Sequence, residues 1–128
     1  MSTPRPISAV VRLPEFERDF ARLLRKYRTL EDDLVFFTEY ALRLFHEKGL
    51  PTGRIERVAG LGFDEPPVYV AKKFACQALK SKGSCTGIRV VWAWFPDEGR
   101  IEFAEIYLKA DKAVEDKQRL KKRYGRSG

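Results

Sequence analysis

Hydrophobic positions divide the chain into a helical first half and a strand-rich second half. Over residues 14–27, apolar side chains recur at helical spacing and basic side chains occupy the other side. Pro14 stands where such a helix would begin, with two glutamates near the positive end of its dipole. The pattern predicts an amphipathic helix that ends at about Tyr27, preceded by a short strand over residues 7–12.

A second helix is predicted directly afterwards. Thr29 can cap it, with Asp32 at the reciprocal position, and Gly49 followed by Pro51 would end it. Its expected buried stripe consists of Leu34, Phe37, Ala41, Leu44 and Phe45. Because the connection between the two helices is so short, we expect an antiparallel helical hairpin that covers one face of a sheet.

Three later runs are rich in β-branched and aromatic residues and are bounded by turn residues, over residues 68–71, 88–95 and 101–108. Short gaps between them predict antiparallel pairing. The preceding segment, residues 50–67, is rich in glycine and proline and is expected to be a connection, with a short extended piece at 54–58. The predicted fold class is therefore α+β: an N-terminal strand, a two-helix hairpin, an antiparallel meander of about three strands and a short C-terminal helix.

A register for the first strand pair follows if Cys76 faces Cys85. That register sets three pairs opposite each other: Lys72 with Arg89, Val70 with Val91 and Val68 with Ala93. Like charges directly opposed in a sheet are unfavourable, so an anion such as phosphate is expected between the two cations. Alternatively, both side chains point into solvent at a sheet edge.

Composition narrows the class of protein. The 128 residues suit one domain, 44% of them are hydrophobic and 34% charged, and the net charge of +7 favours polyanionic partners. No apolar run approaches the ~20 residues that span a bilayer, and the N-terminus lacks the apolar core of a signal peptide, so we expect a cytoplasmic protein without a membrane partner.

The two cysteines match no zinc pattern and are expected to be thiols, and no metal site is predicted. The single histidine, His46, is expected to be a solvated or helix-end residue, and its being alone excludes a paired-histidine ribonuclease.

The last segment, residues 110–128, is a basic helix or tail that carries seven basic and three acidic side chains. Its spacing allows a weakly amphipathic helix that Gly125 would end. Such a charge run is either a solvated face or frayed tail, or a contact for nucleic acid or a protein partner.

The strands would present a cationic surface with aromatic neighbours, formed by Lys72, Lys73, Arg89, Lys109, Tyr69 and Tyr107. Such side chains can cleave RNA without a metal or cofactor. The 2′-hydroxyl attacks the adjacent phosphate, a lysine crowded by other cations can accept a proton, arginine stabilises the phosphoryl oxygens, and aromatic rings can stack bases. The same side chains also suit RNA binding alone.

Five short stretches, residues 20–27, 32–34, 68–72, 87–92 and 106–109, resemble recurrent stretches of the RelE/ParE superfamily of type II toxins, over nearly the whole chain. The resemblance implies a RelE-like fold and a site that cleaves messenger RNA on the ribosome. Arg89 would stabilise the phosphate transition state, Lys72 would act as base or electrostatic clamp, and Lys109 would assist the leaving group. RNA contacts are expected from Lys73, Tyr69, Tyr107, Lys121, Lys122 and Arg123.

The resemblance also implies a cognate antitoxin, with an acidic or amphipathic segment that docks on the basic sheet or displaces the last helix. A homodimer is a further expected possibility. Two departures leave other functions open: Val70 occupies a place where a second lysine often stands, and no tyrosine follows Lys109 until Tyr124. The alternatives are a ParE-like DNA gyrase inhibitor without nuclease activity and an inactive member that only binds RNA or an antitoxin.

Overall fold

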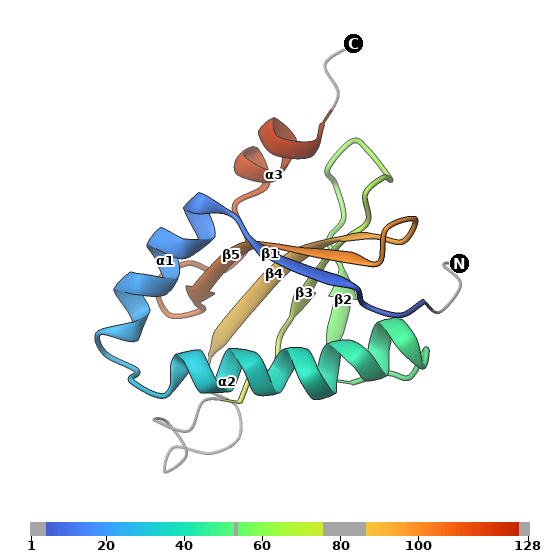
Figure 1. The fold of residues 1–128 in the computed structure, drawn as a ribbon. Helices are drawn as coiled ribbons and strands as arrows, with labels where there is room; N and C mark the ends of the chain where they lie inside the picture. The colour runs from blue at the N-terminus through green and yellow to red at the C-terminus, as the bar shows by residue number, and fades with distance from the viewer. Residues whose placement is uncertain (1–4, 53, 76–86, 126–128) are drawn as a thin grey trace.

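A mixed five-stranded sheet forms the centre of the molecule (Figure 1). The computed structural model describes residues 5–52, 54–75 and 87–125. Its elements in chain order are β1 (Ala9–Arg12), α1 (Pro14–Leu24), α2 (Leu30–Phe36), the π-helix η1 (Phe37–Glu47), β2 (Ile55–Arg57), β3 (Val68–Ala71), β4 (Ile88–Phe95), β5 (Arg100–Leu108) and α3 (Lys117–Tyr124). The α+β class is confirmed, as are the two helical segments and the short C-terminal helix.

The strands lie in the order β1-β5-β4-β3-β2. Strands β3, β4 and β5 form the predicted antiparallel meander, whereas β1 pairs with β5 in parallel, so the sheet is mixed. Parallel neighbours need a long connection, and the helices and strands between β1 and β5 provide it. Strand β2 adds an edge beside β3, where a short extended piece was expected.

The predicted register of the meander is confirmed. Val68 pairs with Ala93 and Val70 with Val91, and the next pair is Ala71 with Val90. Continuing this register by one residue sets Lys72 opposite Arg89. The two cysteines used to reach the register lie outside the described residues.

A β-bulge in the β4–β5 pair changes which face of the sheet the side chains of β5 point to. Val91 pairs with Glu105 and Trp92 with Phe103, which leaves Ala104 as the extra residue. Phe103 and Ile106 consequently both face the main core, although they are three residues apart. The bulge therefore lets two apolar residues of odd spacing share one face.

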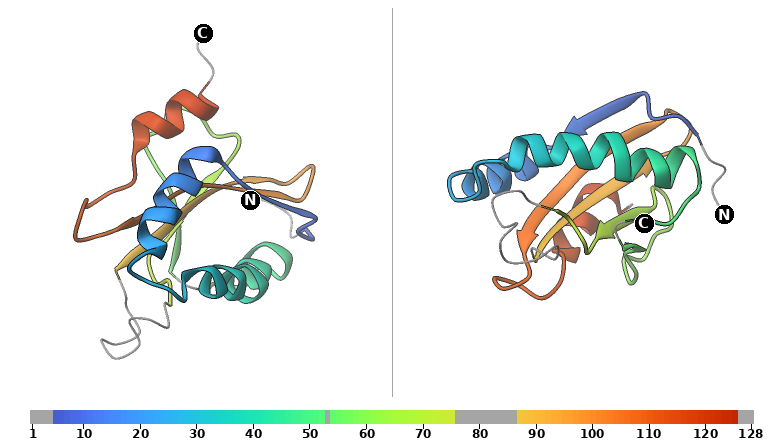
Figure 2. Two further views of the ribbon diagram at one scale, coloured as in Figure 1. Left: turned by 60° about the vertical axis from the view of Figure 1, so that its left-hand side comes forward. Right: turned by 90° about the horizontal axis from the view of Figure 1, so that it is seen from below.

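Helices α1, α2 and η1 all cover one face of the sheet, but they do not form the expected antiparallel hairpin (Figure 2). They diverge from their common turn because each packs on a different part of the sheet. Phe16 of α1 stacks on Phe103 of β5 with ring centroids 5.2 Å apart, whereas Phe37 contacts Trp92 of β4 at 5.8 Å. Two separate sets of aromatic contacts thus set the angle between the helices.

The predicted buried stripe of the second helical segment is confirmed at Leu34 and Phe37 and is wrong at Leu44. Phe37, Leu42 and His46 are its buried positions in η1, while Leu44, which we expected in the stripe, is 40% exposed. The expectation used an α-helical period. In a π-helix each N–H bonds to a carbonyl five residues earlier, as Lys48 does to Arg43, so the turn is wider and buried positions recur after five and four residues.

The other face of the sheet carries a second apolar cluster instead of the bare basic surface that we expected. Val70, Val91 and Ala93 face α3 and residues 58–63, and Leu120 of α3 is fully buried among them. Strands that are apolar on both faces must be covered on both. Two hydrogen bonds hold α3 on this face. Arg119 Nη1 donates to Asp19 Oδ2 of α1 at 2.8 Å, and Tyr124 Oη donates to Glu102 Oε1 of β5 at 2.9 Å.

Candidate anion-binding site

Three of the predicted site residues lie at one end of the sheet, on the face away from α1 and α2. Strand alternation places Lys72 and Arg89 on the same face as Val70 and Val91. Arg89 pairs directly with Tyr107 of β5. Lys72, Arg89 and Tyr107 therefore form a row across β3, β4 and β5.

Lys109 lies at the same end of the sheet. It follows β5 directly, and its N–H donates a hydrogen bond of 2.7 Å to the carbonyl of Gly87, which precedes β4. Its side chain is exposed. The pairing of the strands thus gathers the three cations of the predicted site, Lys72, Arg89 and Lys109, at one end of the sheet.

A carboxylate already compensates part of this charge. Lys72 Nζ lies 2.8 Å from Glu56 Oε1, a residue of the edge strand β2. The hydrogen bond from Lys72, with charge contributions from Arg54 and Arg89, lowers the pKa of Glu56 below its ordinary value. The register predicted an anion such as phosphate between Lys72 and Arg89, whereas Glu56 belongs to β2, on the other side of β3 from the strand of Arg89.

Two donors in the row are buried without a hydrogen-bond partner among the described residues, Arg89 Nε and Tyr107 Oη. Burial raises the pKa of Tyr107 to about 12, and the nearby Arg89 guanidinium offsets only part of this rise. The phenol therefore keeps its proton at neutral pH and is a donor. A ligand with several acceptor oxygens, such as a phosphate group, would satisfy both atoms.

The Lys112 side chain adds a further cation to this end of the sheet. Its ammonium lies 5.2 Å from the centroid of the Tyr107 ring and forms an ion pair with the buried carboxylate of Glu105. The Tyr107 ring is only 5% exposed, so a base could stack on it only if Lys112 moved. Tyr107 is thus placed to donate a hydrogen bond and not to stack.

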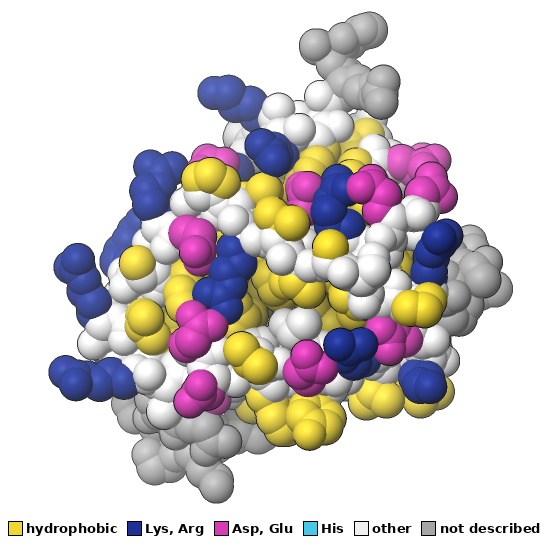
Figure 3. All heavy atoms as spheres, in the orientation of Figure 1, with side chains coloured by type: hydrophobic (Ala, Val, Ile, Leu, Met, Phe, Trp, Pro, Cys, Tyr) yellow, Lys and Arg dark blue, Asp and Glu magenta, His cyan; other side chains and the backbone are white. Residues whose placement is uncertain are grey.

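The remaining predicted RNA contacts are dispersed. Tyr69 lies on the opposite face, half-buried against Phe45, His46 and Trp92, so the structure does not bring it together with Lys72. Lys73 is exposed next to the row. The side chains of Lys121, Lys122 and Arg123 are exposed on α3. The space-filling view of the face covered by α1 and α2 shows basic side chains along the edge formed by α1, and basic and acidic side chains interspersed over the rest of this face (Figure 3).

The only histidine takes no part in this site. His46 is buried on the opposite face, where its Nε2 accepts a hydrogen bond of 3.0 Å from Trp92 Nε1. Our expectation that it would be solvated is wrong, because the π-helix turns it inward; its position at a helix end is confirmed.

The sequence analysis did not identify two charged residues that lie beside the row, Glu56 and Lys112. Alternation within the extended piece at residues 54–58 could have placed Glu56 beside Val70, but such a short segment gives no partner strand. The position of Lys112 could not be predicted from a sequence pattern, because this residue follows β5 outside any strand or helix and within a run of charged residues.

Within residues 5–52, 54–75 and 87–125 there is no group of three or more His, Cys, Asp and Glu side chains arranged to hold a metal ion. No helix in this part of the chain has the length and apolar character needed to cross a bilayer. Comparison with family models, curated proteins and solved structures found no match.

Proposed function

We propose that this chain is the toxin of a type II toxin-antitoxin system and acts in the cytoplasm as a metal-independent endonuclease of messenger RNA on the ribosome. The observation that carries the proposal is the row of Lys72, Arg89 and Tyr107 with Lys109 at its side, in which two buried donors have no acceptor among the described residues. A cognate antitoxin would neutralise it by occupying this end of the sheet.

The order of elements supports a RelE-like assignment. A strand, two helices, a three-stranded meander and a last helix are the order that the resemblance implies, and the chain has this order with β2 added before the meander. Fold alone does not determine activity, so the proposal depends on the row of side chains.

Each side chain of the row has a chemical role in this proposal. Arg89 stabilises the charge that builds on the phosphoryl oxygens when the 2′-hydroxyl attacks. The protonated Tyr107 donates a hydrogen bond to the same phosphate or to the leaving 5′-oxygen, with Lys109 assisting. Lys72 suits an electrostatic clamp better than a base, because its nearest partner is the carboxylate of Glu56 and not another cation. The proton of the attacking 2′-hydroxyl then passes to solvent water, while Tyr107 or Lys109 protonates the leaving 5′-oxygen.

The ion pair between Lys72 and Glu56 favours a second candidate function, which is binding without catalysis. With Lys72 paired to Glu56, the row supplies donors and positive charge but no free base, which suits binding without chemistry. A DNA gyrase inhibitor and an inactive RNA- or antitoxin-binding member are proteins of this kind.

Replacing Arg89 by alanine should abolish growth arrest by the expressed chain, because the transition-state charge loses its principal partner. Loss of one such interaction costs roughly a hundredfold or more in rate. Arg18→Ala on α1 removes an exposed arginine elsewhere and should leave growth arrest unchanged. Unaltered toxicity of a folded Arg89→Ala protein would contradict the proposed site.

The same cells distinguish the two candidate functions. Cleaved messages with normal DNA supercoiling are expected for the endonuclease. Intact messages with blocked topoisomerase would support the gyrase inhibitor instead and would overturn the nuclease assignment.

Replacing Glu56 by glutamine should strengthen RNA binding several-fold at low salt, because Lys72 then has no carboxylate competing with phosphate. The slope of log affinity against log salt should steepen by up to about 0.7, the value for one more contact to a single strand. Asp97→Asn, an exposed residue in the β4–β5 turn, makes the same charge change and serves as the control. Equal gains in both variants would mean that only net charge matters.

A further inference from the structure

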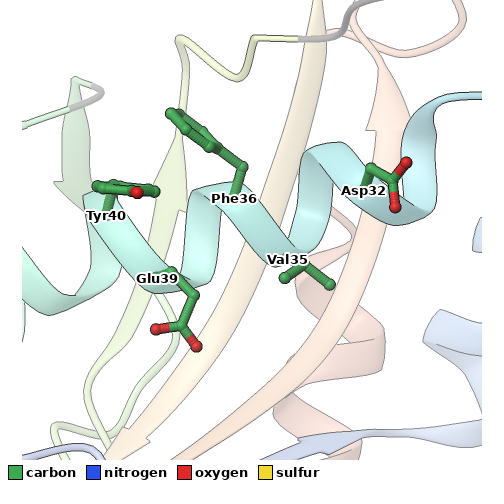
Figure 4. Close-up of a pocket in the computed structure, with 5 residues that line it drawn as sticks. All are labelled: Asp32, Val35, Phe36, Glu39 and Tyr40. Atoms are coloured by element: carbon green, nitrogen blue, oxygen red, sulfur yellow. The ribbon is translucent and has the colours of Figure 1, made fainter.

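The outer side of the second helical segment carries an exposed apolar stripe that has no role in the proposed site. Phe36, Tyr40 and Leu44 recur every four residues, and Val35 lies beside Phe36. Their exposed fractions are 61% for Phe36, 58% for Tyr40, 51% for Val35 and 40% for Leu44. Figure 4 shows Val35, Phe36 and Tyr40 of this stripe projecting from the helix together with the acidic side chains of Asp32 and Glu39, with the strands behind the helix.

The exposed residues share one side of the helix because their spacing of four residues is close to one helical turn. That spacing is slightly more than the α-helical turn of 3.6 residues and slightly less than the wider turn of the π-helix η1, which begins at Phe37. The Phe36 and Tyr40 rings lie with centroids 4.3 Å apart, so they form a continuous apolar surface. Contiguous apolar patches of this kind are often interaction surfaces, whereas singly exposed apolar side chains are not.

The charges at the two ends of the stripe are opposite. Asp32 lies four residues before Phe36 and Lys48 four residues after Leu44, and both side chains are exposed. An antiparallel copy of the helix centred on Tyr40 would set Tyr40 against Tyr40, Phe36 against Leu44 and Asp32 against Lys48. Antiparallel helices also align their dipoles favourably. The stripe is thus complementary to itself.

We propose that this stripe, Val35, Phe36, Tyr40 and Leu44, is the interface of a symmetric homodimer in which the two copies pair antiparallel. The four side chains expose on the order of 400 Å² of surface. A standard interface buries about 800 Å² on each partner, so this interface is small and the dimer is expected to be weak. The interface lies on the helix-covered side, so the Lys72–Arg89–Tyr107 row stays accessible in the dimer.

Sedimentation velocity of the full chain from about 1 to 500 µM tests the proposal, because a small interface is expected to associate only towards the upper end of this range. The native protein should pass from monomer to dimer, and Phe36→Glu should weaken dimerisation by at least tenfold. Val114→Glu changes a residue of equal exposure, 60%, outside the stripe and should leave the dimer unchanged. Circular dichroism of each variant confirms that it is folded.

A charge exchange tests the orientation of the two helices. Asp32→Lys should weaken the dimer several-fold by setting it against Lys48 of the other copy, and adding Lys48→Asp should restore the original affinity. Failure of the second change to restore it would exclude antiparallel pairing at this register.

A native chain that stays monomeric at 500 µM would overturn the proposal, as would a dimer that Phe36→Glu leaves intact. Binding of a basic amphipathic peptide to the stripe of a monomeric chain would assign the surface to a different protein. Neither outcome bears on the nuclease assignment, which the Arg89 variants test separately.

Discussion

The His46→Gln protein should lose less stability than the native chain when the pH falls from 6.5 towards 4. Burial lowers the pKa of His46 from 6.5 to about 3. Phe45, Tyr69, Trp92 and Trp94 surround the imidazole, so its neighbouring rings carry no charge that would favour protonation. The unfolded chain can bind this proton at a pH where the folded chain cannot.

The direction of the effect follows from the two pKa values. Between the folded value of about 3 and the unfolded value of 6.5, the unfolded state holds more protons, so stability rises with pH across this window and is complete above it. The slope for one such group approaches about 1.4 kcal/mol per pH unit. Acidification towards pH 4 should therefore cost the native chain roughly 3 kcal/mol from His46 alone.

Urea unfolding at pH 7, 6, 5 and 4, followed by the fluorescence of the buried tryptophans, measures this difference. Glutamine can accept the hydrogen bond from Trp92 Nε1 and does not titrate, so His46→Gln isolates the protonation. The carboxylates of Glu31 and Glu56, whose pKa values are lowered in the folded chain, contribute equally to both proteins. Parallel pH profiles for the two proteins would show that His46 is not held neutral.

Replacing Lys112 by methionine should destabilise the fold by about 2–3 kcal/mol, because it leaves the carboxylate of Glu105 buried beside an apolar group. Glu105 is 1% exposed, and its Oε1 accepts a hydrogen bond of 2.8 Å from the Asp116 N–H. In the Lys112→Met protein only this oxygen would keep a partner. The Lys112 ammonium is the partner that the described residues supply to Oε2. Loss of this contact should also loosen the turn that leads to α3.

Lys109→Met is the matched control for this change. Lys109 precedes Lys112 by three residues, and its side chain is exposed, so its replacement should alter the free energy of unfolding by no more than about 0.5 kcal/mol. Equal effects of the two substitutions in urea unfolding would contradict a structural role for the Lys112–Glu105 pair.

Much of the architecture follows from local patterns. Apolar residues at helical spacing around Phe16 and Phe20, and β-branched runs separated by short turns, specify the elements and the antiparallel meander. Even the register that sets Lys72 opposite Arg89 could be argued from the sequence, by setting Cys76 opposite Cys85. These features depend on residues that are close together in the sequence, so they can be predicted from the order of residues alone.

Long-range contacts decided the remainder. The parallel place of β1 beside β5, the angle between α1 and α2, and the cover that α3 provides for the second face all depend on packing between distant segments. The π-helix that turns His46 inward is a helix geometry that a 3.6-residue period does not predict.

The candidate site divides in the same way. Residue type and strand register alone placed Lys72 and Arg89 on one sheet face and suggested that an anion should lie beside them. Only the tertiary structure showed that Lys72 pairs with Glu56 of the edge strand and that Arg89 Nε and Tyr107 Oη are buried without acceptors among the described residues. Charge and strand register are properties of residue order, whereas burial and the choice of partner are set by which distant strands and turns come together.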